Sequence, residues 1–152
     1  MDLLRHALAT VAYRGAKTLR GAPEGFPDFS AGAGTRTPVQ ILAHLGDLFD
    51  WALLLAQGNP AWKSSNPLPW PQEVQRFFAS IQALDNRLLA PLACPPERLL
   101  QGPIADALTH VGQLALLRRM AASPVRGENY FVAEIVAGKF EIEHPPKNPC
   151  AP

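Results

Sequence analysis

Three polar side chains occur at positions where the surrounding pattern predicts apolar contacts. His44 lies between Ile41 and Leu48 on the apolar stripe of a predicted helix. Asp106 and His110 are four residues apart in a second predicted helix, so they share one face and direct their side chains to one point. A carboxylate on such a face is costly to bury without a cation. One metal ion would account for all three residues.

Two imidazoles and one carboxylate form a ligand set that leaves coordination positions open for water or substrate. Open sets of this kind are typical of catalytic rather than structural metal sites. Each residue also has a simpler interpretation. Asp106 is favoured by the helix dipole in a first turn, His44 fits a hydrogen-bonded core histidine, and an Asp/His pair at this spacing is also a helix-surface interaction. Spacing alone leaves both interpretations open.

The remaining histidines and the cysteines suggest no second site. His6 is expected to be partly exposed on the first helix, and His144 to be solvated near the C-terminus. Cys94 and Cys150 form no CxxC or zinc-ribbon spacing, so two reduced thiols are expected.

Prolines divide the chain into the elements that would position these ligands. The 152 residues include sixteen prolines, which leave long proline-free windows at 1–22, 39–59, 72–90, 104–123 and 125–144. The second window opens on a capping box from Thr37 to Gln40, with Pro38 at the first helical position. Its apolar residues recur at helical spacing, namely Ile41, Leu45, Leu48, Ala52 and Leu55.

Similar spacing predicts two further helices, one from just after Pro71 to about residue 90 and one from Pro103 to Ser123, and composition predicts a helix over about 3–19. We therefore predict one all-α domain over residues 1–152, a four-helix bundle. The long connection from Gly58 to Trp70 suggests a crossover that leaves the second and third helices parallel. Residues 127–140 are expected to add a short helix or an extended piece, and 141–152 a loose tail.

The bundle must bring the three ligands to one level. With a rise of about 1.5 Å per residue, His44 lies about 9 Å past Pro38, and His110 about 10.5 Å past Pro103. These depths match directly if the two helices are parallel. If the crossover makes them antiparallel, the levels meet only when the helix starts are offset.

Composition excludes several classes of partner. A net charge of +1, from 14 basic and 13 acidic residues without runs of like charge, argues against a nucleic-acid surface. No uninterrupted apolar stretch approaches the length of a membrane helix, and Asp2, Arg5 and His6 stand where a secretory signal would be apolar. A cytoplasmic location without membrane association is expected.

The ligand-bearing segments resemble a known family. Residues 37–47 read TPVQILAHLGD and residues 106–113 read DALTHVGQ, and together they resemble the DinB/YfiT-like superfamily of bacterial metalloenzymes. The resemblance implies a four-helix bundle, often with a crossover. It also implies a divalent metal held by His44 and by the Asp106 and His110 pair. The commoner family pattern has three histidines, so Asp106 is a departure that would favour harder ions and lower affinity.

The resemblance implies a metal-dependent enzyme that binds Zn²⁺ or Ni²⁺ and activates a low-molecular-weight thiol for transfer or isomerisation. Hydrolysis by water is the near alternative. Four further residues are candidates for the pocket or for outer-shell contacts: Asp47, Gln113, Tyr13 and Arg118. Asp47 would accept a hydrogen bond from His44 or be an exposed acid, and Arg118 would meet an anionic substrate.

A second hypothesis is a non-catalytic bundle, a small-molecule binder or self-associating stress protein with a degenerate metal site. Asp106 in place of the usual histidine favours it. A homodimer is also expected, because the chain has more aromatic surface than four short helices easily cover. The residues concerned are Trp51, Trp62, Trp70, Phe77 and Phe78, of which the two phenylalanines are expected to lie in the core.

Overall fold

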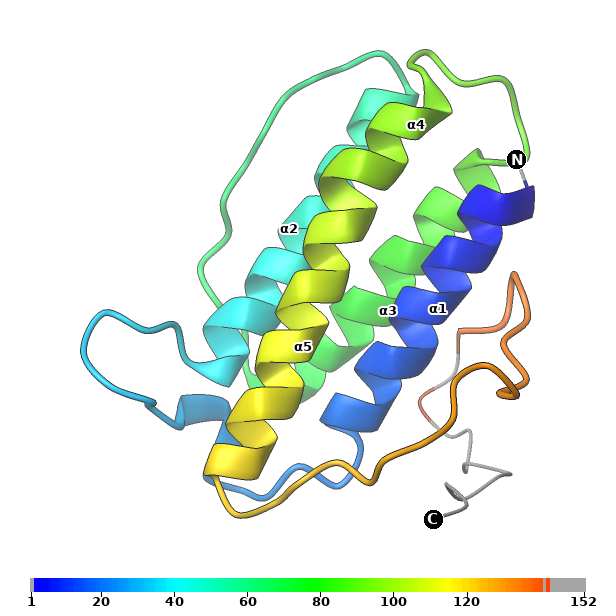
Figure 1. Cartoon of the computed structure of the whole chain (residues 1–152). Coiled ribbons are helices and arrows are strands. Elements are labelled where there is room, and N and C mark those ends of the chain that lie inside the picture. Colours follow the sequence, from blue (N-terminus) through cyan, green and yellow to red (C-terminus); the bar gives the residue numbers. More distant parts are fainter. Residues whose placement is uncertain (1, 141, 143–152) are drawn as a thin grey trace.

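A computed structural model describes residues 2–140 and 142 of the chain. The described residues form helices and loops without a strand, which confirms the all-α prediction. The elements in chain order are α1 (Asp2–Leu19), the 3-10 turn η1 (Phe26–Asp28), α2 (Pro38–Ala56), α3 (Trp70–Arg87), α4 (Pro96–Leu99), the π-helical η2 (Leu100–Ile104) and α5 (Ala105–Met120). The last three join without a gap, so the molecule is a bundle of four long helices (Figure 1).

The connection between α2 and α3 is a crossover, as predicted. It runs from one end of the bundle to the other along the outside, so α2 and α3 point the same way (Figure 1). Their C-terminal ends lie together, because Arg87 Nη2 donates a hydrogen bond of 2.7 Å to the carbonyl of Ala56. Helices α1 and α5 run in the opposite direction. The two ligand-bearing helices α2 and α5 are therefore antiparallel.

The last helix begins at Pro96, and the prediction that Pro103 begins it is wrong. Pro103 lies inside the helix, in the widened turn η2. Proline lacks an N–H and its ring crowds the carbonyl four residues earlier, and a π turn relieves this conflict without ending the helix. From His110 the helix continues ten residues to Met120, about 15 Å, whereas His44 lies about 9 Å from the start of α2. This offset lets antiparallel helices present ligands at one level.

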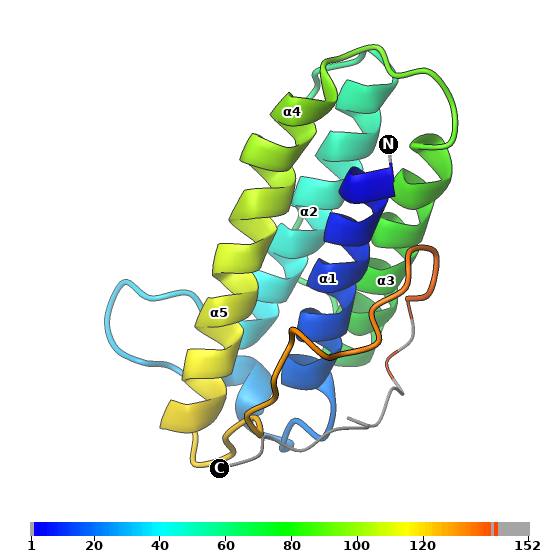
Figure 2. The ribbon, with the colours of Figure 1, turned by 45° about the vertical axis from the view of Figure 1, so that its right-hand side comes forward.

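The segment after α5 follows the extended alternative. Residues 124–140 contain turns and bends without a helix, and they run back along α1 (Figure 2). Glu128 is the main anchor, since its carboxylate accepts hydrogen bonds of 2.6 Å from both Tyr13 Oη and Lys17 Nζ. Residues 141 and 143–152, which include almost all of the predicted tail as well as His144 and Cys150, lie outside the described residues.

The aromatic residues are divided between the core and the crossover loop. Phe77 is fully buried and packs against Phe49 and Phe78. Trp62 is 44% exposed, lies in the crossover loop and packs on Trp51. Much of the aromatic surface is thus covered within one chain. The homodimer stays a prediction, and a single 16.5 kDa species in sedimentation would contradict it.

Helix α2 is the most apolar helix of the bundle core. By length and composition alone it would be long enough to cross a membrane, but 56% of that stretch is buried inside the bundle. Asp47 and Asp50 also interrupt its sequence. The first turn has the predicted cap, in which the Thr37 N–H donates a 2.9 Å hydrogen bond to Gln40 Oε1. The cap fixes where α2 begins and therefore the level of His44.

Gly15 allows α1 to approach α3 closely, and Gly15→Ala is expected to destabilise the fold by about 1 to 2 kcal/mol. A Cβ at this position would lie 2.7 Å from Cζ of Phe77, which is enclosed in the core and has little room to move. Overpacking of this kind costs about 1 to 3 kcal/mol, and alanine's better helix propensity returns up to about 1 kcal/mol.

Gly112→Ala is the matched control, because Gly112 is also helical and a Cβ there would have no neighbour within 4 Å. It should be neutral or slightly stabilising. Urea denaturation measures both free energies of unfolding. Equal effects of the two substitutions would contradict a close contact between α1 and α3.

Candidate metal centre

The structure brings the three predicted ligands together. One ligand atom from each of His44, Asp106 and His110 lies within 4.8 Å of the others. Asp106 bridges the two histidines: one carboxylate oxygen is 3.9 Å from Nε2 of His44 and the other is 3.5 Å from Nε2 of His110. The imidazole rings meet edge to face, with centroids 4.7 Å apart. The three side chains form a group that could hold a metal ion.

The distances within this group fit a shared ion. Two ligands bonded to one Zn²⁺ at about 2.1 Å are at most about 4.2 Å apart. Both Asp106 to histidine distances are below that value. The widest separation in the set, up to 4.8 Å, needs only a small side-chain rotation. The donor set of imidazole nitrogens and carboxylate oxygen also suits a borderline divalent ion.

Gln113 holds His110 in the orientation that a ligand needs. Its Oε1 lies 2.8 Å from Nδ1 of His110, one turn along α5. When Nδ1 donates to this oxygen, the tautomer is fixed and Nε2, the nitrogen nearest Asp106, keeps its lone pair. Metal-binding histidines usually have such a partner on the nitrogen that faces away from the ion. Gln113 also lines the pocket beside His110.

His44 is partly covered by the crossover loop. Its side chain is 19% exposed, and the ring of Trp62 lies edge to face against it at 5.8 Å. Burial lowers the pKa of His44, and the positive charge of Arg36 and the neighbouring His110 lower it further, which outweighs the opposite effect of Asp106. The imidazole is therefore held neutral at pH 7, the form that binds metal.

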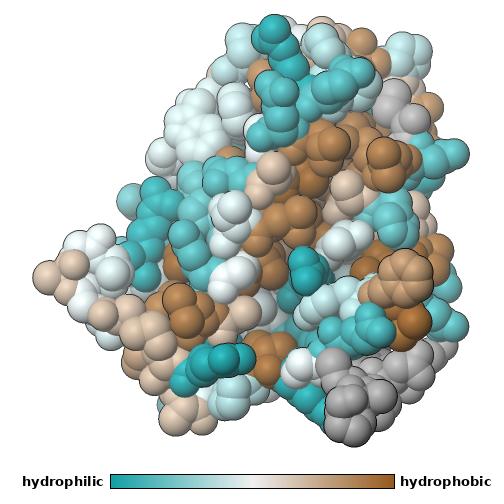
Figure 3. All heavy atoms as spheres, in the orientation of Figure 1, coloured by the Kyte–Doolittle hydropathy of each residue, from teal (hydrophilic) through white to brown (hydrophobic). Residues whose placement is uncertain are grey.

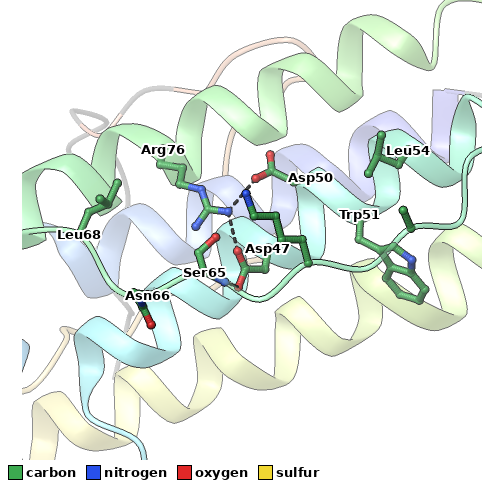
Figure 4. Close-up of a pocket in the computed structure, with 10 residues that line it drawn as sticks. Asp47, Asp50, Trp51, Leu54, Ser65, Asn66, Leu68 and Arg76 are labelled. Carbon is green, nitrogen blue, oxygen red and sulfur yellow. Dashed lines mark hydrogen bonds and ion pairs between the residues drawn. The ribbon is translucent and has the colours of Figure 1, made fainter.

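Asp47 belongs to a charged network on the side of α2 that faces α3 and the crossover loop. Its Oδ1 accepts a 2.6 Å hydrogen bond from Arg76 of α3, and its Oδ2 accepts one of 2.9 Å from the backbone N–H of Ser65 (Figure 4). Arg76 also donates to Asp50, at 2.7 Å. Asp47 thus ties the crossover loop and α3 to α2. The structure gives it these partners in place of the hydrogen bond to His44 that the sequence suggested.

Asp47→Asn is expected to cost about 1.5 to 3 kcal/mol of stability at pH 7, because it removes a buried, charge-assisted pair. Burial would raise the pKa of Asp47, but hydrogen bonds from Arg76 and Ser65 outweigh it and hold the pKa below its usual value. A carboxyl whose pKa is depressed by folding adds stability above its unfolded pKa, about 3.9, and loses that contribution as the pH falls through the folded value.

Denaturation at pH 7 and again near pH 3 measures this difference. The gap between wild type and Asp47→Asn should shrink at the lower pH. Asp50→Asn is the control: Asp50 contacts the same guanidinium but is 51% exposed, so its loss should cost less than about 1 kcal/mol. A gap that is independent of pH would contradict the assigned ion pair.

Tyr13 and Arg118 have structural contacts away from the three ligands, which corrects their assignment as pocket residues. Burial and the hydrogen bond to Glu128 raise the pKa of Tyr13 to about 12, so its hydroxyl stays a donor to the segment after α5. Arg118 is 5% exposed and donates hydrogen bonds to backbone carbonyls at the ends of α1 and α5. Its guanidinium is engaged by these carbonyls, and Arg118 is not among the residues that line the pocket beside His110.

Two residues at the site, Trp62 and Arg36, were not assigned to it from the sequence. Trp62 comes from an irregular loop, where no periodicity indicates what a side chain contacts. Arg36 precedes α2 and lines a pocket of about 430 Å³ together with His110 and Gln113. Its place just before the cap of a ligand-bearing helix was the available signal, since a residue there lies near that helix's first turns.

Comparison with protein-family models, with curated proteins and with solved structures found no match to this chain. The function is therefore inferred from the geometry of His44, Asp106 and His110 and from their surroundings.

Proposed function

We propose that this protein binds one divalent metal ion through His44, Asp106 and His110 and is a metal-dependent enzyme of the DinB-like kind. The observation that carries the proposal is the convergence of three ligand atoms from two antiparallel helices within 4.8 Å. Zn²⁺ or Ni²⁺ is the ion that the two imidazoles favour. The reaction class is transfer or isomerisation with a low-molecular-weight thiol, and hydrolysis is the near alternative.

The surroundings of the group support a functional site over a surface interaction of α5. A surface Asp/His pair would need neither a second histidine from α2 nor a partner on the far nitrogen of His110, and both are present. His110 is 9% exposed, whereas Asp106 keeps 47% of its side chain exposed. The group is thus fixed on the protein side and open on the other, where a further ligand would enter.

The ion and the side chains around its ligands would have distinct roles in the proposed reaction. A divalent ion held here supplies Lewis-acid chemistry, which lowers the pKa of a water or thiol so that a nucleophile exists at neutral pH. Gln113 fixes the imidazole of His110, and Trp62 covers one side of His44 and excludes water from it.

Metal titration of the untagged protein tests this proposal. After treatment with a chelator, the protein should take up one equivalent of Zn²⁺ per chain in a competition with a chromophoric chelator. Co²⁺ in place of Zn²⁺ should give visible absorption bands of a site with mixed nitrogen and oxygen ligands. Uptake well below one equivalent for both ions would overturn the proposal. With metal bound, a screen of thiol transfer distinguishes the enzyme from a metal-dependent binder.

A further inference from the structure

We propose that the pocket beside His110 binds a small carboxylate with an aliphatic tail, and that Arg36 pairs with the carboxylate. The proposal deepens the proposed function, and rests on it, because the candidate metal ligand His110 lines the pocket. It names the class of substrate that the site would take.

The walls of this pocket are mainly apolar. It measures about 430 Å³, within the range of small-molecule sites. Its apolar lining residues are Ala31, Ile41, Leu116, Leu117 and Met120. Leu116 and Met120 are 58% and 50% exposed, although they lie on the helix that carries the ligands. Figure 3 shows hydrophobic surface over the lower part of α5, beside the loop that precedes α2. Large apolar side chains left open around a hollow indicate an apolar ligand.

The pocket also has polar lining residues, one of which is positively charged. Among the described lining residues only Arg36 carries a fixed charge, and it has no hydrogen bond or ion pair within residues 2–140 and 142. A guanidinium presents parallel N–H donors that match a carboxylate in a two-point contact. Thr35, Gln113 and His110 add further polar groups at the wall. A ligand with an anionic head and an aliphatic tail complements this combination of charged, polar and apolar lining residues.

A second pocket, on the side of α2 that faces α3, is lined by side chains of both charges. It measures about 360 Å³ and is lined by Asp47, Asp50, Lys63 and Arg76, among others (Figure 4). Its carboxylates already pair with Arg76, at 2.6 and 2.7 Å. The charges there stabilise the crossover loop, whereas the charge of Arg36 has no partner among the residues that the structure describes.

Isothermal titration of octanoate into metal-free protein tests the proposal without requiring the metal. We expect saturable binding of one octanoate per chain, weaker binding of 1-octanol, and a loss of up to about fourfold for each methylene removed from the chain. Arg36→Gln should weaken octanoate about tenfold. Arg98→Gln, an exposed arginine at the far end of the same long helix as His110, should leave the affinity unchanged.

A second pair of variants tests the apolar wall. Leu116→Asp places a negative charge in the tail site and should abolish octanoate binding. Leu3→Asp changes a leucine on α1 that is more exposed than Leu116, and it should have no effect. Both positions are solvent-accessible, so both variants are expected to fold. Zinc uptake should stay at one equivalent in each.

The outcomes separate the pocket from the metal centre. Absence of saturable octanoate binding, or equal affinity in Arg36→Gln and Arg98→Gln, overturns the pocket proposal even if zinc binds. Octanoate binding without zinc uptake supports the pocket and overturns the metal proposal. If the protein is a dimer that stays intact with octanoate but dissociates in Leu116→Asp, this surface is the contact with a second copy of the chain. That result would overturn the pocket proposal.

Discussion

His44→Ala and His110→Ala are each expected to weaken zinc binding by far more than 100-fold. Loss of a residue that only hydrogen-bonds a ligand typically lowers metal affinity by roughly 10- to 100-fold. Each substitution removes one of two imidazole ligands and leaves a single imidazole with one half-exposed carboxylate. Asp106→Asn should be milder, because the amide oxygen still reaches the site without its charge. Gln113→Ala should fall in the 10- to 100-fold range, since it frees the ring of His110 without removing a ligand.

The same variants make a prediction about stability. An ion that binds only the folded state raises the free energy of unfolding by about 2.7 kcal/mol at a free concentration 100 times its dissociation constant. Wild type should show this increase on addition of Zn²⁺, and the two histidine variants should not. Without metal their melting temperatures report any separate cost of the substitution, such as loss of the contact between His44 and Trp62.

His6→Ala is the matched control, because His6 is an exposed histidine on α1, a helix that supplies no candidate ligand. It should bind zinc as wild type does. Chelator competition gives the affinities, and thermal denaturation with and without Zn²⁺ gives the stabilisation. Equal weakening in all three histidine variants, or no weakening in His44→Ala and His110→Ala, would contradict the ligand assignment.

The helices were predictable because their signals are local. The capping box at Thr37 and the apolar spacing of α2 depend on neighbours within one or two turns, and the structure follows both. The candidate ligand set was predictable for a related reason. Asp106 and His110 are four residues apart on one helix face, and His44 interrupts a stripe that is otherwise apolar.

Pro103 shows where local signals fail. Proline is favoured at the first position of a helix, so the sequence Gly102-Pro103 predicts a helix start. Whether a helix instead accommodates the proline depends on what stabilises the turns before it. Here Leu99 and Ile104 are fully buried, so packing against the bundle keeps the helix continuous through a π turn. That packing is tertiary, and nothing within a few residues of Pro103 reveals it.

The partners of Asp47 and Arg118 were unpredictable in the same sense. Asp47 is three residues from His44, but its hydrogen bonds go to Arg76 and Ser65, which other elements bring into contact. Arg118 does have a local signal, since it continues the buried face of Leu114 and Leu117. A charged residue on that face indicates a structural hydrogen-bonding role as readily as a substrate contact.

Arg118→Met is expected to destabilise the protein by about 2 to 4 kcal/mol, a large share of the roughly 5 to 15 kcal/mol that holds a typical domain together. The guanidinium donates to the carbonyls of Thr18, Arg20 and Gly21 at 2.9, 3.0 and 3.2 Å, where α1 ends and leaves carbonyls without helical partners. It also donates to the Ser123 carbonyl at 2.8 Å, beyond the end of α5. One side chain therefore joins two helix ends.

Methionine keeps most of the volume of Arg118, so the expected loss comes from the carbonyls that it leaves unpaired and not from a cavity. Arg118→Lys should be intermediate, because an ammonium keeps the charge but cannot reach all these acceptors with the geometry of a planar guanidinium. Arg119→Met is the control, since Arg119 is the exposed neighbour and should change stability by less than about 0.5 kcal/mol. Urea denaturation at pH 7 measures the series. If Arg118→Met matched Arg119→Met, the guanidinium would be free, and a substrate contact for Arg118 would again be the better interpretation.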